Sequence, residues 1–381
     1  MFKQTVDFIK EQFKGQDFIP LHEPRFNGNE KKYLLDCIDS TFVSSVGKYV
    51  DDFEKQLATY TGAKYAVAAV NGTAALHMAM IVAGVRNNDI VITQPLSFIA
   101  TCNAISYIGA KPLFVDVDFD TLGLSASKLK EYLFENVIKK SDGFSYHKLT
   151  NQKIAACVPM HTFGHPCRID EIAAICIEYG IALIEDAAES MGSYYKGKHT
   201  GTFGKLGTFS FNGNKTITCG GGGAIITDDE QLAKRAKYLT TQAKVPHRWD
   251  FVHDEIGYNY RMPNLNAALM CAQLEQLNDF LENKRALATK YQEFFKKTDI
   301  QFIVEPNNSN SNYWLCAILL KDKETRDSFL EFTNDNGVMT RPAWALMTKL
   351  VMFKDAMHGN IENAEMIESR LVNIPSSVRL K

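Results

Sequence analysis

Residues 206–229 read LGTFSFNGNKTITCGGGGAIITDD. Two apolar runs, 207–211 and 223–228, are typical of buried strands, and between them lie one lysine, Lys215, and four consecutive glycines. Glycine has no Cβ, so backbone in such a run can turn sharply or approach a ligand closely. A lysine held in a partly dry pocket favours its neutral amine and acts as a nucleophile or base. The stretch therefore predicts two sheet strands with a reactive amine between them.

Five more apolar runs of strand length precede this stretch, and they alternate with helical patterns. The runs are 64–70, 89–94, 111–118, 154–160 and 181–187. Helical spacing of apolar residues follows at 73–84, at 98–109 and at 168–180, where Gly180 is a common terminating residue. Strands that are buried on both faces and separated by helices indicate a mostly parallel sheet. The predicted fold class is α/β, with about seven strands flanked by helices.

The pattern changes after about residue 262. Residues 264–297 have the spacing of one long helix, and the remainder has the mixed pattern of a smaller α+β domain. We therefore expect an N-terminal arm (1–35), a large domain (36–262), and a long helix with a small C-terminal domain (263–381). A second domain of this kind would form a cleft against the first.

Composition restricts the possible functions. The 381 residues carry a formal net charge of -2 and are 45% hydrophobic, which argues against nucleic acid or an anionic membrane as a partner. The eight cysteines are scattered without CxxC pairs or metal-ligand spacing, which favours a reducing compartment and no metal site. The charged N-terminus does not resemble a signal peptide, and no apolar run is long enough to span a membrane. We expect a cytoplasmic protein.

Polar residues follow several of the predicted strands, where parallel sheets bind ligands. Gly72 and Thr73 begin a helix directly after the first strand, so their free N–H groups form either a phosphate site or a plain helix cap. Asp186 and Glu189 come at the end of the run 181–187. A carboxylate there could keep a ring nitrogen of a cofactor protonated, or could lie solvated at a helix start.

Ser210 and Lys215 add two more groups of this kind. Ser210 could hold the same phosphate as Gly72 and Thr73, whereas Lys215 on its own would more often be a surface residue. Together, the strand ends supply phosphate donors, an acid for a ring nitrogen and an amine that forms a Schiff base. Pyridoxal 5′-phosphate requires all three from a protein. A phosphate-loop hydrolase is excluded because GxxxxGK[ST] is absent.

The chain resembles the sugar-nucleotide aminotransferases of the DegT/DnrJ/StrS type, within the fold-type I pyridoxal-phosphate enzymes. The resemblance runs from IPLHEPRFNGNE (19–30) to NIPSS (373–377). Its other marks are FVSSVGKYVDDFE (42–54), NGTAAL (71–76), IEDAAES (184–190), GTFGKLGTFSFNGNK (201–215), GYNYRMPN (257–264) and TRPAW (340–344). It implies a fold-type I aminotransferase with pyridoxal 5′-phosphate as its cofactor.

The resemblance also implies residue roles. Lys215 would bond covalently to the cofactor and move the proton, Asp186 would pair with the ring nitrogen, and Glu189 would lie near the ring hydroxyl. The other implied cofactor contacts are the phosphate-binding Gly72, Thr73 and Ser210, the ring-stacking Phe98, His161, and Asn259, which would reach the phosphate of the neighbouring subunit. A homodimer with shared active sites is therefore implied. For Phe98 a core position is the alternative, and for His161 a hydrogen-bonded place at the strand end.

The substrate expectation comes from the details of the same motifs. Where many members have a glutamate, this chain reads Cys219 and then four glycines, like the branch that acts on UDP-4-keto-6-deoxy-N-acetylhexosamines in the bacillosamine and legionaminic acid routes. We expect transamination at C4 of such a sugar, with L-glutamate as the amine donor, in cell-surface polysaccharide biosynthesis. Candidate substrate contacts are Arg25, Phe26, Ser45 and Lys48. ALMTKL (345–350) stands where relatives often have a histidine.

Two alternative functions stay open from the sequence. One is transamination at C3 of a dTDP-linked keto sugar, which needs the same residues around the cofactor. The other is a non-catalytic sensor that binds cofactor or sugar nucleotide and regulates a partner. The dehydratases of this family are excluded, because a histidine replaces their lysine and Lys215 is present here.

Overall fold

The central sheet contains the seven strands that the sequence predicts. They are β1 (Tyr65–Ala69), β2 (Ile90–Thr93), β3 (Lys111–Phe114), β6 (Lys153–Cys157), β7 (Ala182–Asp186), β10 (Leu206–Ser210) and β11 (Gly223–Thr227). The order is β1-β11-β10-β7-β6-β2-β3-β16, with β16 (Met357–His358) at one edge and β5 (Ser145–His147) and β4 (Val137–Lys139) attached to β6. Along this order all pairs from β10 to β16 are parallel, whereas β11 runs antiparallel to β1 and β10, and the attached β5 runs antiparallel to β6 and β4. This computed structural model, which describes residues 1–379, confirms the α/β prediction.

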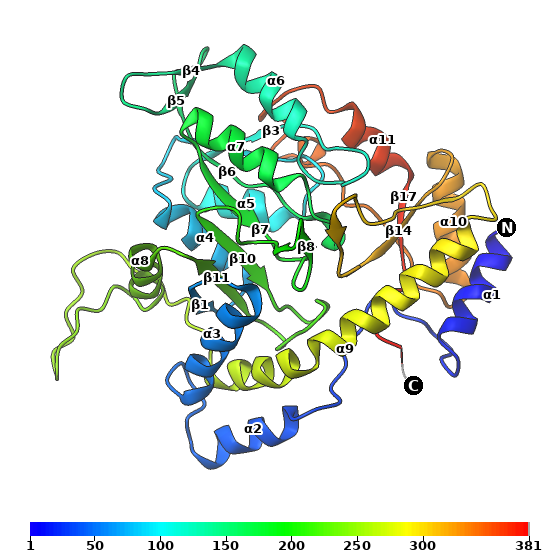
Figure 1. Cartoon of the computed structure of the whole chain (residues 1–381), viewed down its shortest axis with the longest axis horizontal. Helices are drawn as coiled ribbons and strands as arrows, with labels where there is room; N and C mark the ends of the chain where they lie inside the picture. Colours follow the sequence, from blue (N-terminus) through cyan, green and yellow to red (C-terminus); the bar gives the residue numbers. More distant parts are fainter. Residues whose placement is uncertain (380–381) are drawn as a thin grey trace.

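Helices cover both faces of this sheet because its side chains are apolar on both sides (Figure 1). On β1, Val67 and Ala69 face one core and Ala68 faces the other. The first core is closed by α4 (Gly72–Val82), α5 (Ile99–Tyr107) and α8 (Glu230–Thr240). The opposite face is closed by α3 (Lys48–Thr61) and α9 (Asn264–Phe295), and farther along by α6 (Ala126–Asn136) and α7 (Ile169–Tyr179).

The C-terminal part is a second, smaller sheet with helices. Its strands are β12 (Gln301–Phe302), β14 (Cys316–Leu319), β17 (Leu371–Ile374) and β15 (Arg341–Pro342), all paired antiparallel in that order. Its helices are α10 (Lys323–Asp335) and α11 (Glu362–Arg370), and it is joined by the N-terminal helix α1 (Phe2–Gln12). Val6 and Ile9 of α1 lie in one core cluster with Phe329 and Val372, so the first residues of the chain complete its last unit.

Helix α9 belongs to both parts. It contains neither glycine nor proline and begins after Pro263, which explains its unbroken length of 32 residues, about 48 Å. Its first half packs with α2 (Glu30–Asp39) and α3, and its second half supplies Leu287 and Tyr291 to the smaller core. A small sheet of β13 (Ser309–Asn310), β8 (Tyr194–Tyr195) and β9 (Lys198–His199) also links the parts.

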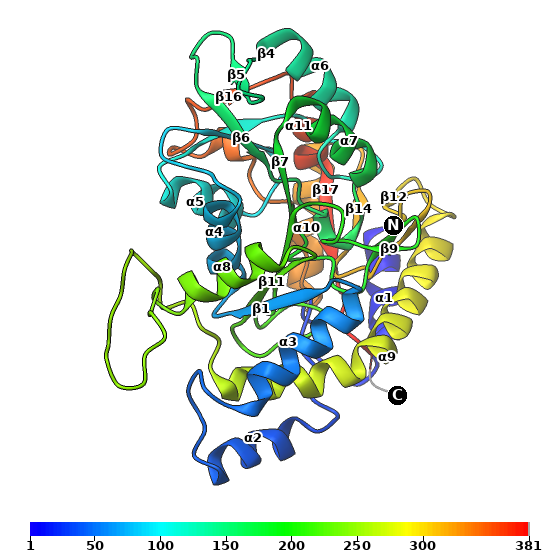
Figure 2. The same ribbon diagram turned by 60° about the vertical axis from the view of Figure 1, so that its left-hand side comes forward.

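The segment 241–263, between α8 and α9, projects from the body of the molecule (Figure 2). Three large apolar side chains on it, Trp249, Phe251 and Ile256, are exposed. Within residues 1–379, none of the helices combines the length and the apolar character that a membrane span requires.

Candidate active site

One cavity, of about 320 Å³, opens beyond the carboxyl ends of β1, β7 and β10. Seven of the residues singled out in the sequence line it: Gly72, Thr73, Phe98, Asp186, Glu189, Ser210 and Lys215. Its other lining residues are Asn71, Leu76, Ala100, Thr101, Met160, Ala188, Asn212, Asn214, Trp314 and Trp344. The topology explains this convergence, because the carboxyl ends of parallel strands share one edge of the sheet.

Lys215 lies in a turn that follows β10, where its N–H donates to the carbonyl of Asn212 at 3.0 Å. Its Nζ is 3.4 Å from Oε1 of Glu189 and 3.8 Å from the ring centroid of Trp314. The indole Nε1–H of Trp314 donates to the carbonyl of Asn214 at 2.6 Å, which ties the ring to this turn. The amine is thus held between a carboxylate and an aromatic face.

Glu189 is buried beside this lysine. Its Oε2 accepts the N–H of Phe163 at 2.8 Å. Burial raises the pKa of Glu189 to about 7, and the charge of Lys215 and the Phe163 N–H oppose this rise. The group can therefore hold or release a proton near neutral pH.

Asp186 is the last residue of β7 and only 2% exposed. Thr101 Oγ1 donates to Oδ2 at 2.7 Å, and the N–H of Ala188 donates to Oδ1 at 3.2 Å. Burial raises the pKa of Asp186, while these two hydrogen bonds and Lys215 act in the other direction. Among residues 1–379 no ion pair to Asp186 forms, so a protonated ring nitrogen in the cavity would supply the missing cation.

The other end of the cavity suits an anion. Asn71 caps α4 by accepting the N–H of Ala74 at 2.8 Å, which leaves the first N–H groups of the helix for a ligand. A Cβ on Gly72 would lie 2.7 Å from that of Ser210, so only glycine lets the helix start meet β10. A Cβ on Gly223 would lie 2.4 Å from the carbonyl of Asn71. The glycine run thus lets β11 approach the helix start.

These groups fit pyridoxal 5′-phosphate. The start of α4 and Ser210 offer donors to its phosphate, Asp186 offers a carboxylate to its ring nitrogen, and Lys215 offers an amine to its aldehyde. Phe98, which is 48% exposed on the cavity wall, offers a face for the ring.

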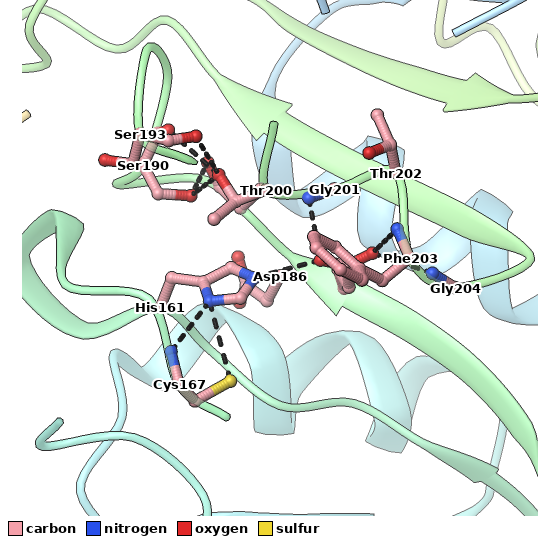
Figure 3. Close-up of polar contacts among 12 residues, drawn as sticks. His161, Cys167, Asp186, Ser190, Ser193, Thr200, Gly201, Thr202, Phe203 and Gly204 are labelled. Atoms are coloured by element: carbon pink, nitrogen blue, oxygen red, sulfur yellow. Dashed lines mark hydrogen bonds and ion pairs between the residues drawn. The ribbon is translucent and has the colours of Figure 1, made fainter. Parts of the chain in front are cut away.

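His161 does not line this cavity, in contrast to the expected place beside the cofactor. Its ring is completely buried, and its Nε2 is 3.1 Å from Oε2 of Glu185. Nδ1 accepts the N–H of Cys167 at 3.3 Å, so Nε2 carries the proton donated to Glu185 (Figure 3). Glu185 precedes Asp186 on β7 and therefore points to the opposite face of the sheet. The structure thus contains the hydrogen-bonded histidine that the sequence left as the alternative.

Glu185 is satisfied by its surroundings. The N–H of Gly201 donates to Oε2 at 2.7 Å, and those of Phe203 and Gly204 donate to Oε1 at 2.6 and 2.7 Å (Figure 3). With His161 these make four donors around one carboxylate. The arrangement holds the loop 200–204 against β7.

Five other predicted residues lie away from the cavity. Asn259 is exposed on the segment 241–263, where its Oδ1 accepts from Arg261 at 3.1 Å. Arg25 donates from Nε to the carbonyl of Val378, and Lys48 pairs with Asp36 at 2.7 Å. Phe26 is exposed and Ser45 half-buried. The roles proposed for Asn259, Arg25, Phe26, Ser45 and Lys48 stay predictions.

Three side chains of this cavity were not found from the sequence. Thr101 is in the first turn of α5, and Phe98 is the extended residue that caps this helix, so the two lie close together in the chain. Trp344, in the motif TRPAW, lies 6.2 Å from Phe98 between ring centroids. Trp314 follows a polar loop of the C-terminal part and has no local signal, because only the tertiary fold brings it to Lys215.

A larger hollow of about 640 Å³ lies between α6 and residues 357–360. Its buried carboxylate, Asp116, already accepts the N–H groups of Asn363 and Ala364 at 3.0 and 2.9 Å. Both oxygens of Asp116 already accept hydrogen bonds, so Asp116 offers no free charge to a ligand in this hollow.

Comparisons with known proteins agree with this geometry. The profile of the DegT/DnrJ/EryC1/StrS aminotransferase family matches residues 24–381. The GDP-perosamine synthase of Escherichia coli O157:H7 is 38% identical over 363 residues, which is 94% of this chain and 93% of that protein. The GDP-perosamine synthase of Vibrio cholerae is 36% identical, with 94% of both chains covered. The crystal structure of the aminotransferase TlmJ from Streptoalloteichus hindustanus superimposes with a TM-score of 0.85 at 26% identity, covering 94% of this chain and 93% of that one.

Proposed function

Because the chain belongs to the DegT/DnrJ/EryC1/StrS aminotransferase family and is a pyridoxal-phosphate-dependent sugar aminotransferase, we propose that it aminates C4 of a nucleotide-linked 4-keto-6-deoxyhexose, with L-glutamate as donor. One observation carries this proposal. Lys215, Glu189 and Asp186 meet in a single cavity whose far end is lined by the start of α4.

Bound pyridoxal phosphate supplies an electron sink for the carbon that loses its proton. Lys215 Nζ removes that proton from the amino-bearing carbon of the donor and returns one in the second half-reaction. Glu189 and the Trp314 ring keep Nζ in place while it is free. Asp186 stabilises the proton on the ring nitrogen, and Thr101 orients its carboxylate. Gly72, Thr73 and Ser210 anchor the phosphate.

Two observations bear on the nucleotide. The sequence features around the glycine run favour a UDP-linked N-acetylhexosamine of the bacillosamine or legionaminic acid type. The relatives at 38% and 36% identity are named for GDP-perosamine and favour a GDP-linked sugar. A panel of UDP-, GDP- and dTDP-linked 4-keto-6-deoxy sugars separates these possibilities, and the position of the new amine in the product separates C4 from C3 transfer.

We also propose a homodimer in which Asn259 of each chain reaches the partner's phosphate site. The exposed Trp249, Phe251 and Ile256 of the segment 241–263 support this, because single chains rarely leave such side chains in water. In the dimer, Arg25, Phe26, Ser45 and Lys48 would contact the sugar nucleotide. Sedimentation and complementation between Lys215 and Asn259 variants test the shared site.

The absorption spectrum with and without L-glutamate tests the reaction. The wild-type protein should show a visible band of covalently bound cofactor that disappears with L-glutamate and returns with the correct keto sugar. Lys215→Ala should abolish turnover and leave the fold intact, whereas Lys205→Ala, at an exposed position in the same stretch, should behave as wild type. A band that does not respond to L-glutamate would exclude it as donor, and turnover by Lys215→Ala would contradict the assignment.

A further inference from the structure

Residues 19–25 form a strap that connects the two parts of the molecule close to the Lys215 turn. At one end, the N–H of Ile19 donates to the carbonyl of Gly337 at 2.8 Å. In the middle, the N–H of Ser376 donates to the carbonyl of Leu21 at 2.7 Å. At the other end, Gln273 Nε2 donates to the carbonyl of Arg25 at 2.8 Å. The strap is therefore fixed along its length, and so is the side chain of His22.

The two ring nitrogens of His22 are buried without a hydrogen bond, although the residue as a whole is half-buried. Both ring nitrogens are inaccessible to water, and neither makes a hydrogen bond of normal geometry. The backbone of Asn214 faces the ring, together with the charged groups of Lys284, Arg25 and Lys215. Burial, followed by these cations, holds the pKa of His22 well below its usual range. A neutral ring has one N–H and one lone pair, and leaving both buried without a partner is unfavourable.

Lys284, in the middle of α9, has a hydrogen-bond donor without an acceptor. It is 1% exposed, and its Nζ donates to the carbonyls of Trp314, at 3.3 Å, and Ser376. Within residues 1–379 it forms no ion pair, and one of its three protons is left without an acceptor. Burial lowers the pKa of Lys284 to about 7. Lys284 donates to the carbonyl of Ser376, and the N–H of Ser376 donates to the carbonyl of Leu21, the residue before His22, so the unpaired donor and the unpaired ring belong to one local network.

We propose that His22 is a positioning residue for Lys215, accepting the third Nζ–H of Lys284 and donating its own N–H to the carbonyl of Asn214. The Asn214 carbonyl has two lone pairs, of which Trp314 Nε1 uses one. Both neighbours of Lys215 in the fold, the Asn214 peptide and the Trp314 ring, are then fixed by the same buried group. This inference rests on the proposed role of Lys215.

The position of Lys215 is important because its amine must find the same carbon in every half-reaction. A displacement of about 1 Å can reduce a rate by about 100-fold. The strap connects this position to the smaller part of the molecule through Leu21 and Ser376. Through His22, the C-terminal unit thus fixes the position of the turn that contains Lys215.

The test measures capture of the cofactor by the cofactor-free protein. Pyridoxal 5′-phosphate is added, the product is trapped with borohydride at timed intervals, and the modified lysine is identified by mass spectrometry. His22→Phe, which keeps the ring size but removes both nitrogens, should slow capture at Lys215 by about 10-fold or more. His22→Gln, which keeps a donor and an acceptor, should stay within about 3-fold of wild type.

His165→Phe is the matched control. His165 is also completely buried with two unpaired ring nitrogens, but its ring packs on Tyr313, at 5.2 Å between centroids. Its capture rate should equal that of the wild type. If His22→Phe does not fold, Lys284→Met removes the other half of the pair and should show the same slowing.

Three results would overturn the inference: wild-type capture by His22→Phe, equal slowing by His165→Phe, or slowing by His22→Gln as large as by His22→Phe. Trapping of the wild-type protein at a lysine other than Lys215 would instead overturn the proposed function. His22→Phe and Lys284→Met should also lower the rate constant of the half-reaction with L-glutamate more than they raise its KM.

Discussion

Two adjacent carboxylates on β7, Glu185 and Asp186, are both buried, at 0% and 2% exposure, yet their surroundings differ. Glu185 accepts from three backbone N–H groups and from His161. Asp186 accepts from one hydroxyl and one N–H, and it lines the cavity that contains Lys215. Side-chain alternation along a strand sends the two to opposite faces of the sheet.

The difference teaches how to tell a structural carboxylate from a functional one. A buried charge is costly until enough donors surround it. On the Glu185 side the chain itself provides those donors. On the Asp186 side the chain leaves room for a cation that only a ligand brings. Burial by itself would have marked both residues as equally significant.

The largest expected effect comes from removing the charge of Asp186, the carboxylate whose surroundings leave room for a cation. Asp186→Asn keeps the shape but cannot stabilise a proton on the ring nitrogen. We expect the half-reaction with L-glutamate to slow by about 10³-fold or more, which is about 4 kcal/mol of barrier. Unfolding free energy should change by about 1 kcal/mol at most, because one weakened hydrogen bond is offset by removal of a buried charge. Equal losses of rate and of cofactor affinity would show that Asp186 only binds.

The complementary change, on the satisfied side, should act on stability. Glu185→Ala leaves three backbone N–H groups and His161 without their acceptor, and we expect a loss of about 3 kcal/mol in urea unfolding. The half-reaction rate of the folded fraction should stay within about 3-fold of wild type. A rate loss as large as that of Asp186→Asn would contradict the distinction between a structural Glu185 and a functional Asp186.

Glu189 lines the same cavity as Asp186, and its ionisation makes the folding stability depend on pH. Its pKa in the folded protein, about 7, lies above the ordinary value of 4.5, so the folded chain binds more protons than the unfolded chain between these values. Stability therefore falls as pH rises through this window. The cofactor-free wild type should lose about 2.5 kcal/mol between pH 5 and pH 8 that Glu189→Gln does not lose. Identical pH profiles in urea unfolding would contradict this.

The smallest effect concerns the donor that orients Asp186. Thr101→Val removes the hydroxyl from Oδ2, and we expect the half-reaction to slow by about 3- to 10-fold, about 1 kcal/mol. Thr200→Val is the matched control, because Thr200 Oγ1 is bonded to Ser190 instead, at 2.8 Å to Oγ (Figure 3). It should lower stability by a similar amount and leave the rate unchanged. A rate loss for both would point to general loosening.

The sequence was sufficient where function depends on strand ends. Seven apolar runs located the sheet, and the residues after them, such as Gly72, Asp186 and Lys215, were found because parallel strands end at one edge. His161, for which the sequence leaves both a place beside the cofactor and a hydrogen-bonded place at the strand end, does not line the cavity and pairs with Glu185, and any role at the cofactor stays a prediction. The strand β6 ends at Cys157, but its pairing continues beyond that point, where Met160 bridges Asp186 and the N–H of His161 donates to the carbonyl of Asp186 at 3.2 Å.

Other features depend on contacts between distant parts of the chain. Trp314 reaches Lys215 through the pairing of Asn312 and Ser193, and no local pattern encodes it. Helix α1, within the predicted N-terminal arm (1–35), packs into the C-terminal core, a contact that no local pattern predicts. The unpaired ring nitrogens of His22 can be identified only in the folded structure, because they depend on where residues 19–25 pack.

The register of β1 has a consequence for synthesis. Tyr65 pairs with Thr227 and Ala69 with Gly223, so β1 leaves the ribosome long before its partner strand exists. Translation at about 5–20 residues per second leaves this apolar strand, and the orphaned face of α1, waiting for many seconds. A nascent chain that stalls before residue 227 would carry an open strand edge of the kind that drives aggregation. Translation through residue 227 is thus a condition for closing this edge of the sheet, and translation into the C-terminal core is a condition for covering α1.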